Sequence, residues 1–440
     1  MRLCIAPETW WHSAAGASPL AIMVFMHVCS GWRASGPDAT RQIHAWFRRA
    51  RPMTVSLYIA SPSHPTRQLL KHDLGSLTHQ ISGLSVYCPL EMLADFLHLP
   101  PNVFPALEKL DLSFGWDSLS AVAPRMHHGL TIFKEARLLR TLFLAGVYHL
   151  RTGALSTEIP IDWARLEELE LRHRGPKDRH AIPDLFRQCT RLRRAVLDLT
   201  NAKALQPIPN HIIDFPFLVL LEITFKVWPA ALMDASRFRH LKELTLASDV
   251  RLTDTNLSKL GPHMPQLGKL VLRNVDLFDW ENEFDGFLAN IYCLREIVFF
   301  DAKLSPRAIF PAFGDRAARG GGTLVPHLEK LSFDNIDIGV EDEDLENYTD
   351  AFGLIVDILG TRLESTPLCD CYLSWSWRYK FDTIPLYGHA KYTIRLLQGL
   401  IDAYPALSIA IEDLEEFVER IQTGAIEPPI RREDYDTESD

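Results

Sequence analysis

The stretch Leu107-Glu108-Lys109-Leu110-Asp111-Leu112 decides the fold of this chain, because its pattern recurs along the sequence. Apolar residues occupy its first, fourth and sixth positions. The same spacing is found in ten hexads, which begin at Ile81, Leu107, Leu139, Leu166, Leu192, Leu218, Leu241, Leu267, Leu294 and Leu328. Neighbouring hexads begin 23 to 34 residues apart. A repeat of this length with a short strand in each unit predicts a solenoid, in which every unit stacks on its neighbours.

Each hexad predicts a short β-strand with one buried face. In the hexad that begins at Leu107, Leu110 and Leu112 alternate with the charged residues Lys109 and Asp111. An alternation with a period of two places the leucines on one face of a strand and the charged side chains on the other. We therefore expect the strands of neighbouring units to pair into a curved parallel sheet, with the stacked leucines as a continuous core.

The segments between the strands have helical character in several repeats. Apolar residues within residues 182–192 follow the spacing of one helix face, and residues 90–97 and 284–294 behave similarly. Prolines that end the return segment precede four of the hexads, at Pro105, Pro216, Pro265 and Pro326. The fold class that follows is α/β: a solenoid of about 10 to 12 repeats with a parallel sheet, helices and loops on its convex side, and helical caps.

Further elements are expected at both ends of the repeat region. Val55, Leu57 and Ile59 alternate with polar residues and predict the first strand of the solenoid. Residues 368–373 predict an eleventh strand and residues 407–411 a last one. Helices are expected at residues 345–363, 390–403 and 412–421, and the acidic residues 341–350 predict a solvated loop.

The hexads and their period resemble the leucine-rich repeat family in its irregular, longer-period intracellular form, over roughly residues 81–334. Repeats of that family usually carry Asn or Cys two or three positions after the last strand leucine, where the residue joins a buried polar ladder. Here Asn occurs only at Asn274 and Asn335, one place earlier. The corresponding places hold Gly115, Val147, Arg174, Thr200 and Val275. The repeat is therefore a divergent form.

A second pattern precedes the repeats. The stretch Val28-Cys29-Ser30-Gly31-Trp32-Arg33 resembles the V-C-x-x-W-R ending of an F-box. Residues 46–57 resemble the linker that follows it in fungal F-box proteins with leucine-rich repeats. The resemblance implies that Val28, Cys29, Trp32 and Arg33 contact a Skp-type adaptor. Only residues 6–10 resemble the opening of an F-box, so we expect it to be degenerate or truncated. Alternatively, the tryptophans of this segment cap the exposed end of the repeat core.

Composition narrows the class of protein. The formal net charge of −10 argues against a nucleic-acid binder, which needs a basic face for phosphate contacts. The seven cysteines are odd in number and mostly far apart, which favours a reduced intracellular compartment, cytoplasmic or nuclear, over a disulfide framework. The strongest apolar run, residues 19–29, is shorter than the roughly 20 residues that span a bilayer. It predicts a buried helix, and we expect no membrane partner.

No arrangement of residues predicts catalysis. The run Gly320-Gly321-Gly322-Thr323 has no Lys before the threonine and no preceding strand that would make it a phosphate loop. The histidines are scattered, and His127-His128 is their only adjacent pair. No nucleophile motif is present. We therefore expect no enzyme, no catalytic residue, no cofactor and no metal.

The strand face opposite the leucines is the candidate binding surface, because solenoids hold partners on this concave wall. Counting alternate strand positions gives Tyr87, Asp111, Phe143, Glu168, Glu170, Arg172, Asp198, Glu222, Glu243, Lys269, Arg273, Phe300, Asp334 and Tyr372. Acidic residues from Glu168 to Glu243 predict an acidic middle, interrupted by Arg172 and Arg194, and hence a target with a basic segment. The aromatic members, Phe143, Phe300 and Tyr372, are of the type enriched at binding hot spots.

The expected organisation has four parts. Residues 1–52 form a degenerate F-box-like segment or N-terminal cap, and residues 53–375 form the leucine-rich repeat solenoid. Residues 376–426 form a C-terminal cap, and residues 427–440 an acidic disordered tail.

Three hypotheses of function follow from these observations. The first is a protein-interaction module, namely the substrate-recognition subunit of an F-box type ubiquitin ligase, in which other subunits perform the catalysis. The second is a stand-alone leucine-rich repeat scaffold that does not bind the adaptor, which the eroded N-terminal pattern favours. The third, an enzyme with a site in the last 100 residues, is disfavoured because residues 375–379 and the helices after them indicate a cap.

Overall fold

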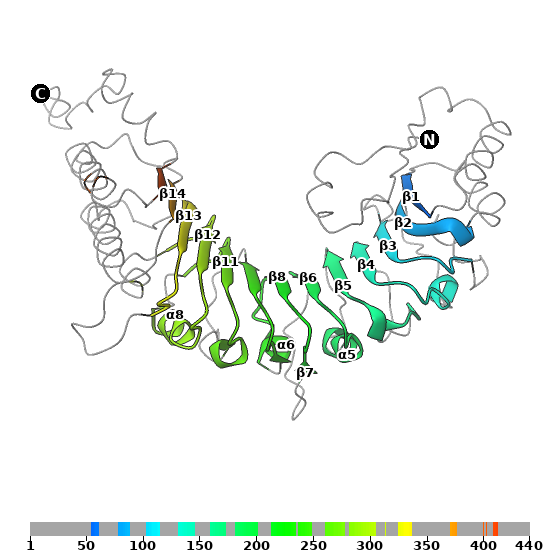
Figure 1. Ribbon diagram of the computed structural model, residues 1–440, viewed down its shortest axis with the longest axis horizontal. Coiled ribbons are helices and arrows are strands. Elements are labelled where there is room, and N and C mark those ends of the chain that lie inside the picture. Colours follow the sequence, from blue (N-terminus) through cyan, green and yellow to red (C-terminus); the bar gives the residue numbers. More distant parts are fainter. Residues whose placement is uncertain are drawn as a thin grey trace, which may run out of the picture. The chain divides into compact units, whose positions relative to one another are not determined.

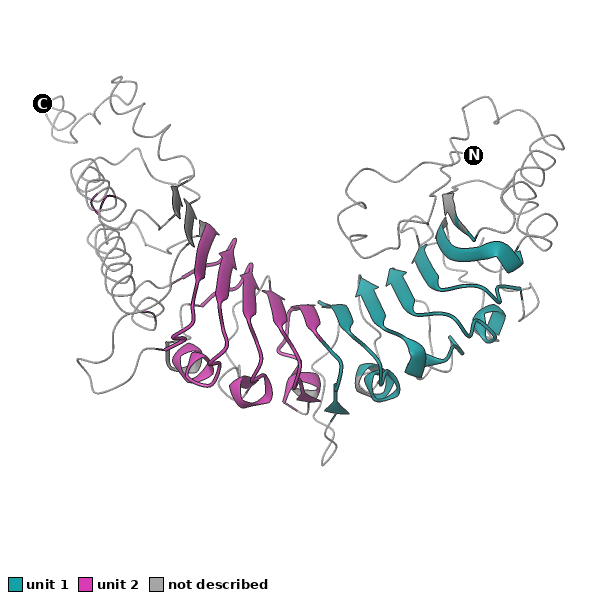
Figure 2. Cartoon of the chain, in the orientation of Figure 1, with its two compact units in different colours: residues 1–218 teal, residues 219–440 magenta. Residues whose placement is uncertain are grey.

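The computed structural model describes the repeat region in segments. They are residues 54–60, 78–88, 103–114, 131–145, 159–172, 181–200, 213–234, 236–248, 260–277, 281–304, 313, 324–336, 370–375, 399, 402 and 408–411. The chain divides into two compact units, residues 1–218 (unit 1) and residues 219–440 (unit 2), as Figure 2 shows. The F-box-like segment, the expected helices at 19–29, 90–97, 345–363 and 412–421, the acidic loop and the tail lie outside the described residues. Of the expected helix 390–403, only Gly399 and Asp402 are described, and both are helical.

Unit 1 contains a parallel sheet whose strand order follows the sequence. Its strands are β1 (Val55–Ala60), β2 (Ile81–Cys88), β3 (Lys109–Phe114), β4 (Thr141–Ala145), β5 (Glu168–Arg172) and β6 (Arg194–Leu199). Every consecutive pair is parallel. A sheet in which each strand pairs with the next one along the chain requires a return segment after every strand, which is the solenoid connection.

Unit 2 repeats the same arrangement. Its sheet contains β8 (Leu220–Phe225), β10 (Glu243–Ser248), β11 (Lys269–Arg273), β12 (Glu296–Phe300), β13 (Lys330–Ile336), β14 (Asp370–Trp375) and β15 (Ser408–Ile411). All neighbouring pairs are again parallel. Two-residue strands lie outside these sheets, β7 (Ile213–Asp214) in unit 1 and β9 (Ser236–Arg237) in unit 2. The predicted α/β leucine-rich repeat solenoid is confirmed, with a strand at every hexad and the three further strands near their expected positions.

Short helices connect the strands. The α-helices are α5 (Ala181–Gln188), α6 (Ala230–Met233) and α8 (Glu281–Leu288), and the 3-10 helices are η5 (Thr78–Gln80), η7 (Thr131–Phe133), η8 (Trp163–Arg165) and η9 (Gly261–His263). Figure 1 shows α5 in unit 1, and α6 and α8 in unit 2, beside the N-terminal ends of the strands. α5 ends four residues before the predicted 192, because residues 189–192 form the turn that leads into β6, and α8 begins and ends earlier than predicted.

A tight turn precedes most hexads and explains the prolines. The first leucine of the hexad donates its N–H to the carbonyl three residues earlier, as Leu107 does to Phe104 (3.3 Å) and Leu267 to Met264 (3.2 Å). Pro105 and Pro265 occupy the second position of these turns, which a fixed φ near −65° favours. Phe104, Met264 and both leucines are buried. The turn therefore inserts two side chains into the core just before each strand begins.

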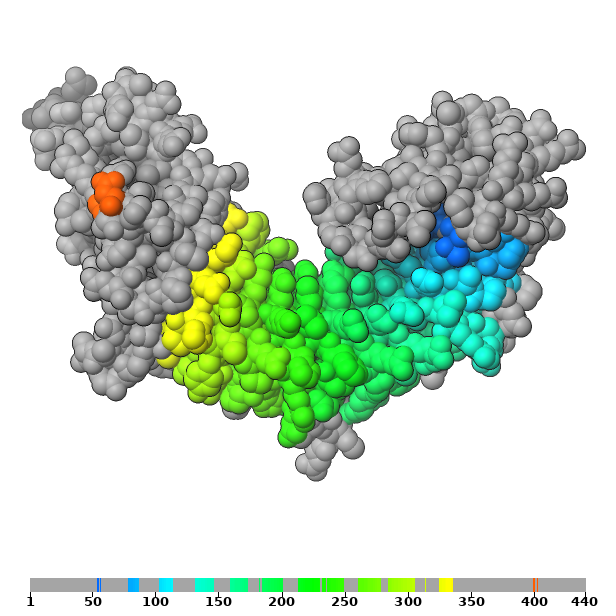
Figure 3. Space-filling view, viewed as in Figure 1, coloured from blue at the N-terminus to red at the C-terminus, as the bar shows by residue number. Residues whose placement is uncertain are grey.

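The core consists of the hexad leucines, which stack from strand to strand. Leu110, Leu142 and Leu169 occupy one register position of unit 1, and all three are fully buried. In unit 2 a neighbouring column, formed by the sixth hexad position, changes from leucine to phenylalanine, because Leu272 is followed by Phe299 and Phe333. The last two rings stack with their centroids 5.0 Å apart. In the space-filling view the part of unit 2 coloured green to yellow forms a continuous surface (Figure 3).

Two polar residues end strands of unit 2 in the left-handed conformation. Asn274 follows β11 with a φ of 52°, and Asp301 follows β12 with a φ of 50°. The Asn274 N–H donates to Phe300 O (2.8 Å), and the Asp301 N–H donates to Asp334 O (2.9 Å). Asn and Asp tolerate this conformation better than other residues with a Cβ. Asn274, which lies one place earlier than the usual Asn of the repeat, therefore allows the left-handed conformation at the end of β11.

The stacked leucines predict a sharp difference between neighbouring positions of one strand. Leu142→Ala in β4 should lower the free energy of unfolding by about 2 to 5 kcal/mol, because it leaves a cavity in a fully buried site. Thr141→Ala, one residue earlier on the opposite face, should change it by less than about 0.5 kcal/mol. Urea unfolding followed by circular dichroism measures both. Equal losses for the two variants would contradict the assigned faces.

Candidate interaction face

The side chains opposite the leucine core form three rows in unit 1. The first row, from β3 to β6, contains Lys109, Thr141, Glu168 and Arg194. The second contains Asp111, Phe143, Glu170 and Val196, and the third contains Ser113, Ala145 and Arg172. Tyr87 is paired in register with Ser113, and its side chain lies outside the described residues. We call this surface the polar face of unit 1.

Unit 2 has a polar face of the same construction. Its first row, from β8 to β13, contains Leu220, Glu243, Lys269, Glu296 and Lys330. The second contains Glu222, Thr245, Val271, Val298 and Ser332, and the third contains Thr224, Ala247, Arg273, Phe300 and Asp334. Tyr372 continues the second row by its register with Ser332, and its side chain is not described. The predicted site residues therefore occupy these rows, one set in each unit, except Asp198, which lies near the end of β6.

A compact cluster on unit 1 surrounds Glu170. Its carboxylate contacts the Arg172 Nε and lies 3.4 Å from Nη1 of Arg194, and the Glu170 side chain is only 13% exposed. The guanidinium carbon of Arg172 lies 5.8 Å from the centre of the Phe143 ring. These four side chains come from β4, β5 and β6. The acidic middle expected from the sequence is therefore partly neutralised at Glu170 by two arginines.

Asp111 is a buried carboxyl group on the same face. It is 8% exposed, and its Oδ1 accepts a hydrogen bond from Ser113 Oγ (3.3 Å). Burial raises the pKa of Asp111 to about 6, and the hydrogen bond from Ser113 and the charge of Lys109 limit the increase. Nearby Glu170 adds to the increase. Sequence alternation assigned Asp111 to the outer face correctly, but it gave no sign that the side chain is buried there.

The carboxylate of Asp198 has a local structural role. Its Oδ1 accepts hydrogen bonds from the backbone N–H of Thr200 (3.0 Å) and from the Thr200 hydroxyl (2.7 Å). Such a contact from Asp to the residue two positions later closes a turn. The Asp198 carboxylate therefore stabilises the end of β6, although the sequence analysis assigned it to partner binding.

Alternating charges run along the first row of unit 2. Lys269 on β11 lies 3.9 Å from Glu243 on β10 and 3.3 Å from Glu296 on β12. Sequence analysis named Lys269 and Glu243 but missed Glu296 and Lys330. Aligning the third position of each hexad, which reads Glu, Lys, Glu and Lys from β10 to β13, would have found them. The ion pairs join neighbouring repeats and neutralise most of this row.

The third row of unit 2 contains an arginine that stacks on an aromatic ring. The guanidinium carbon of Arg273 lies 5.2 Å from the centre of the Phe300 ring, and the two residues are register partners on β11 and β12. Arg273 is exposed, whereas Phe300 is half-buried. Val271 and Val298 occupy the adjacent positions of the second row. An arginine over a phenylalanine thus occurs on the polar face of each unit.

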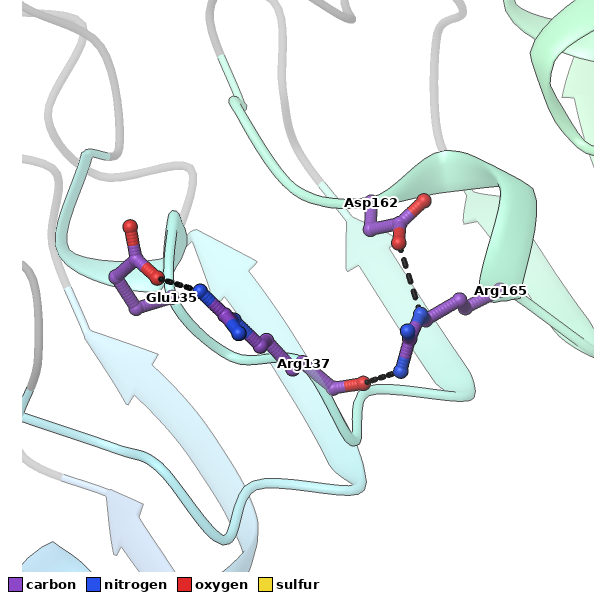
Figure 4. Close-up of polar contacts among 4 residues, drawn as sticks. All are labelled: Glu135, Arg137, Asp162 and Arg165. Carbon is purple, nitrogen blue, oxygen red and sulfur yellow. Dashed lines mark hydrogen bonds and ion pairs between the residues drawn. The ribbon is translucent and has the colours of Figure 1, made fainter.

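Polar contacts also join the turns that precede β4 and β5. Arg165 donates from Nη1 to the carbonyl oxygen of Arg137 (2.8 Å), and its Nε lies 2.9 Å from Asp162 (Figure 4). Arg137 in turn lies 3.4 Å from Glu135. All these side chains are substantially exposed, so each ion pair contributes little to stability. Only the hydrogen bond from Arg165 to Arg137 joins the two turns, whereas each ion pair lies within one turn.

The part of the chain that the structure describes was also searched for metal sites, membrane-spanning helices and reactive thiols. It contains no group of three or more His, Cys, Asp or Glu side chains that could hold a metal ion. None of its helices is long and apolar enough to cross a membrane. Cys189 is buried, and burial raises the pKa of its thiol to about 12, so it stays protonated at neutral pH. Val28, Cys29, Trp32 and Arg33, the expected adaptor contacts, lie outside the described residues.

Comparison with known proteins returned solved structures of low similarity. No protein-family model and no curated protein matches the chain. The crystal structure of the TLR13–ssRNA13 complex is similar at 14% identity and a TM-score of 0.32, covering 69% of this chain and 40% of that chain. A leucine-rich repeat protein of Leptospira interrogans is similar at 12% identity and a TM-score of 0.28, covering 70% of this chain and 84% of that one. The fold assignment itself rests on the hexads and on the strand register.

Because the carboxyl group of Asp111 is buried, its replacement by asparagine is expected to increase the free energy of unfolding in a pH-dependent way. Because its pKa is about 6 in the folded chain and 3.8 ordinarily, the folded state holds the proton more tightly, and stability falls as the pH rises through this window. Asp111→Asn cannot ionise, so it should be more stable than the parent by about 2 kcal/mol at pH 7.5 and equally stable near pH 4.

Urea unfolding at the two pH values measures this difference. Glu168→Gln, an exposed position of the neighbouring first row, is the matched control and should show no pH-dependent gain. A gain of the same size at both pH values would show that ionisation of Asp111 is not its cause.

Proposed function

We propose that this chain is a protein-interaction module whose polar faces bind a partner protein. The observation that carries the proposal is the arginine stacked on a phenylalanine in each unit, Arg172 over Phe143 and Arg273 over Phe300. Arginine and aromatic side chains dominate binding hot spots, and stacking holds both in place before the partner arrives. Neighbouring strands of a solenoid sheet support such side chains on a rigid surface. The proposed module is intracellular and performs no catalysis itself.

The more specific proposal is a substrate-recognition subunit of an F-box type ubiquitin ligase. Its support is the sequence resemblance of residues 28–33 to the end of an F-box and of residues 46–57 to the linker that follows. A Skp-type adaptor would bind through Val28, Cys29, Trp32 and Arg33. The alternative is a stand-alone scaffold that binds its partner in the same way without the adaptor.

Adaptor binding separates these alternatives. The full chain should capture a purified Skp-type adaptor in a pull-down, and Val28→Asp combined with Trp32→Ala should abolish capture, because the apolar contact is lost. Glu168→Gln on β5 is the control and should leave capture unchanged. Absence of capture by the parent chain would contradict the ligase proposal and favour the scaffold. A fall in the urea midpoint of the double variant would assign Trp32 to the cap.

A basic segment is the proposed feature of the target. Glu168 in unit 1 and Glu222 in unit 2 are outer-face carboxylates without an ion pair in the described part of the chain. Glu168→Lys with Glu222→Lys should weaken a captured target about tenfold at low salt and less at high salt, because exposed charges are screened. Asp162→Lys, in the turn before β5, is the control. Unchanged affinity of the double variant would exclude a basic contact at these positions.

A further inference from the structure

The patch around Arg273 is a square of four side chains on two neighbouring strands of unit 2. Val271 and Arg273 lie on β11, and their register partners Val298 and Phe300 lie on β12 (Figure 1). We call these four residues the Arg273 patch. Val271 is 8% exposed, whereas Val298 and Phe300 are half-buried and still have apolar surface to lose. The patch therefore combines an apolar surface with one exposed cation.

The charge of Arg273 is not compensated within the described part of the chain. Its guanidinium contacts the Phe300 ring at 5.2 Å and makes no ion pair there. The carboxylates of Glu243 and Glu296, on the strands beside β11, are paired with Lys269 instead. They lie 3.9 and 3.3 Å from its amino group. The donors of Arg273 are thus left for a group from outside the described part of the chain.

The equivalent arginine of unit 1 shows what a compensated site looks like. Arg172 lies over Phe143 at 5.8 Å, and its Nε also contacts the carboxylate of Glu170. Arg273 has the same stacking on a ring, but the residue two positions earlier on its strand is Val271 in place of a glutamate. A carboxylate supplied by a partner would complete the Arg273 patch as Glu170 completes the cluster of unit 1.

We propose that the Arg273 patch binds a carboxylate side chain of an extended partner segment, with a neighbouring apolar residue of that segment on Val298 and Phe300. The inference rests on the proposed interaction function, not on the adaptor. A stacked guanidinium has already lost much of its freedom, and a charged hydrogen bond beside apolar surface is stronger than one in open water. The patch therefore selects a segment in which an aspartate or glutamate lies next to an apolar residue.

The test uses the full chain, immobilised, and a phage-displayed library of random nonapeptides as the probe. The parent chain should enrich Asp or Glu beside an apolar residue, and Arg273→Gln should remove that enrichment. Arg295→Gln is the matched control, because that exposed arginine of unit 2 already pairs with Glu329 at 2.9 Å, and it should retain the enrichment. For one selected acidic peptide, Arg273→Gln should raise Kd about tenfold or more, and Phe300→Leu about threefold.

Several results would overturn the proposal. These are a parent pool without acidic enrichment, an unchanged acidic enrichment in Arg273→Gln, or loss of the enrichment in Arg295→Gln alone. Enrichment of Lys and Arg only would also overturn it while supporting the basic target segment. Binding of a random single-stranded RNA pool that depends on Arg273, without any acidic peptide, would replace the carboxylate with a phosphate. A chain that fails to capture the adaptor but still selects acidic peptides would retain this proposal and lose only the ligase.

Discussion

Every repeat of this chain depends on the backbone hydrogen bonds that its strand makes with the strands on either side. The same pair of backbone hydrogen bonds joins one hexad to the next in several repeats. The N–H groups of Arg140 and Thr141 both donate to Glu108 O, at 2.8 and 3.1 Å, and those of Arg193 and Arg194 both donate to Glu167 O, at 2.7 and 3.1 Å. A single strand would leave these groups unpaired and its leucines in water. No repeat is therefore expected to be stable alone, and stability within each unit comes from stacking.

The same register decides what the outer face can do. Side chains at equivalent hexad positions are brought opposite one another, where like charges destabilise and opposite charges stabilise. Lys269 between Glu243 and Glu296 satisfies this requirement, as does Arg140 opposite Glu167 at 3.2 Å. Much of the outer charge thus holds repeats together. Outer side chains without an ion pair in the described part of the chain, above all Arg273 over Phe300, are available to bind a partner.

Sequence analysis was most successful where a repeated pattern determined the structure. Each of the ten hexads contributes residues to a strand, and residues as distant as Val55 and Ile411 were assigned to strands correctly. Helix lengths were less accurate, because Cys189 and Leu192 continue the apolar spacing of a helix but belong to a turn. For the outer face, alternation identified which residues point outward, but not whether their side chains are buried or already paired. It could not show that Asp111 is buried, that Asp198 closes a turn, or that Glu170 is held by Arg172 and Arg194.

The sequence by itself determined the solenoid, because hydrophobic spacing is local information: Leu110 and Leu112 face one way and Asp111 the other whatever surrounds them. Only the tertiary structure decided which outer charges pair between neighbouring repeats, because such partners lie 24 to 34 residues apart in the chain. Arg172 and Arg273 each follow their hexad directly, and each lies over a phenylalanine of a neighbouring strand. They differ because Glu170 precedes one by two residues and Val271 the other, which the sequence shows, whereas only folding brings a phenylalanine of the neighbouring strand against each guanidinium.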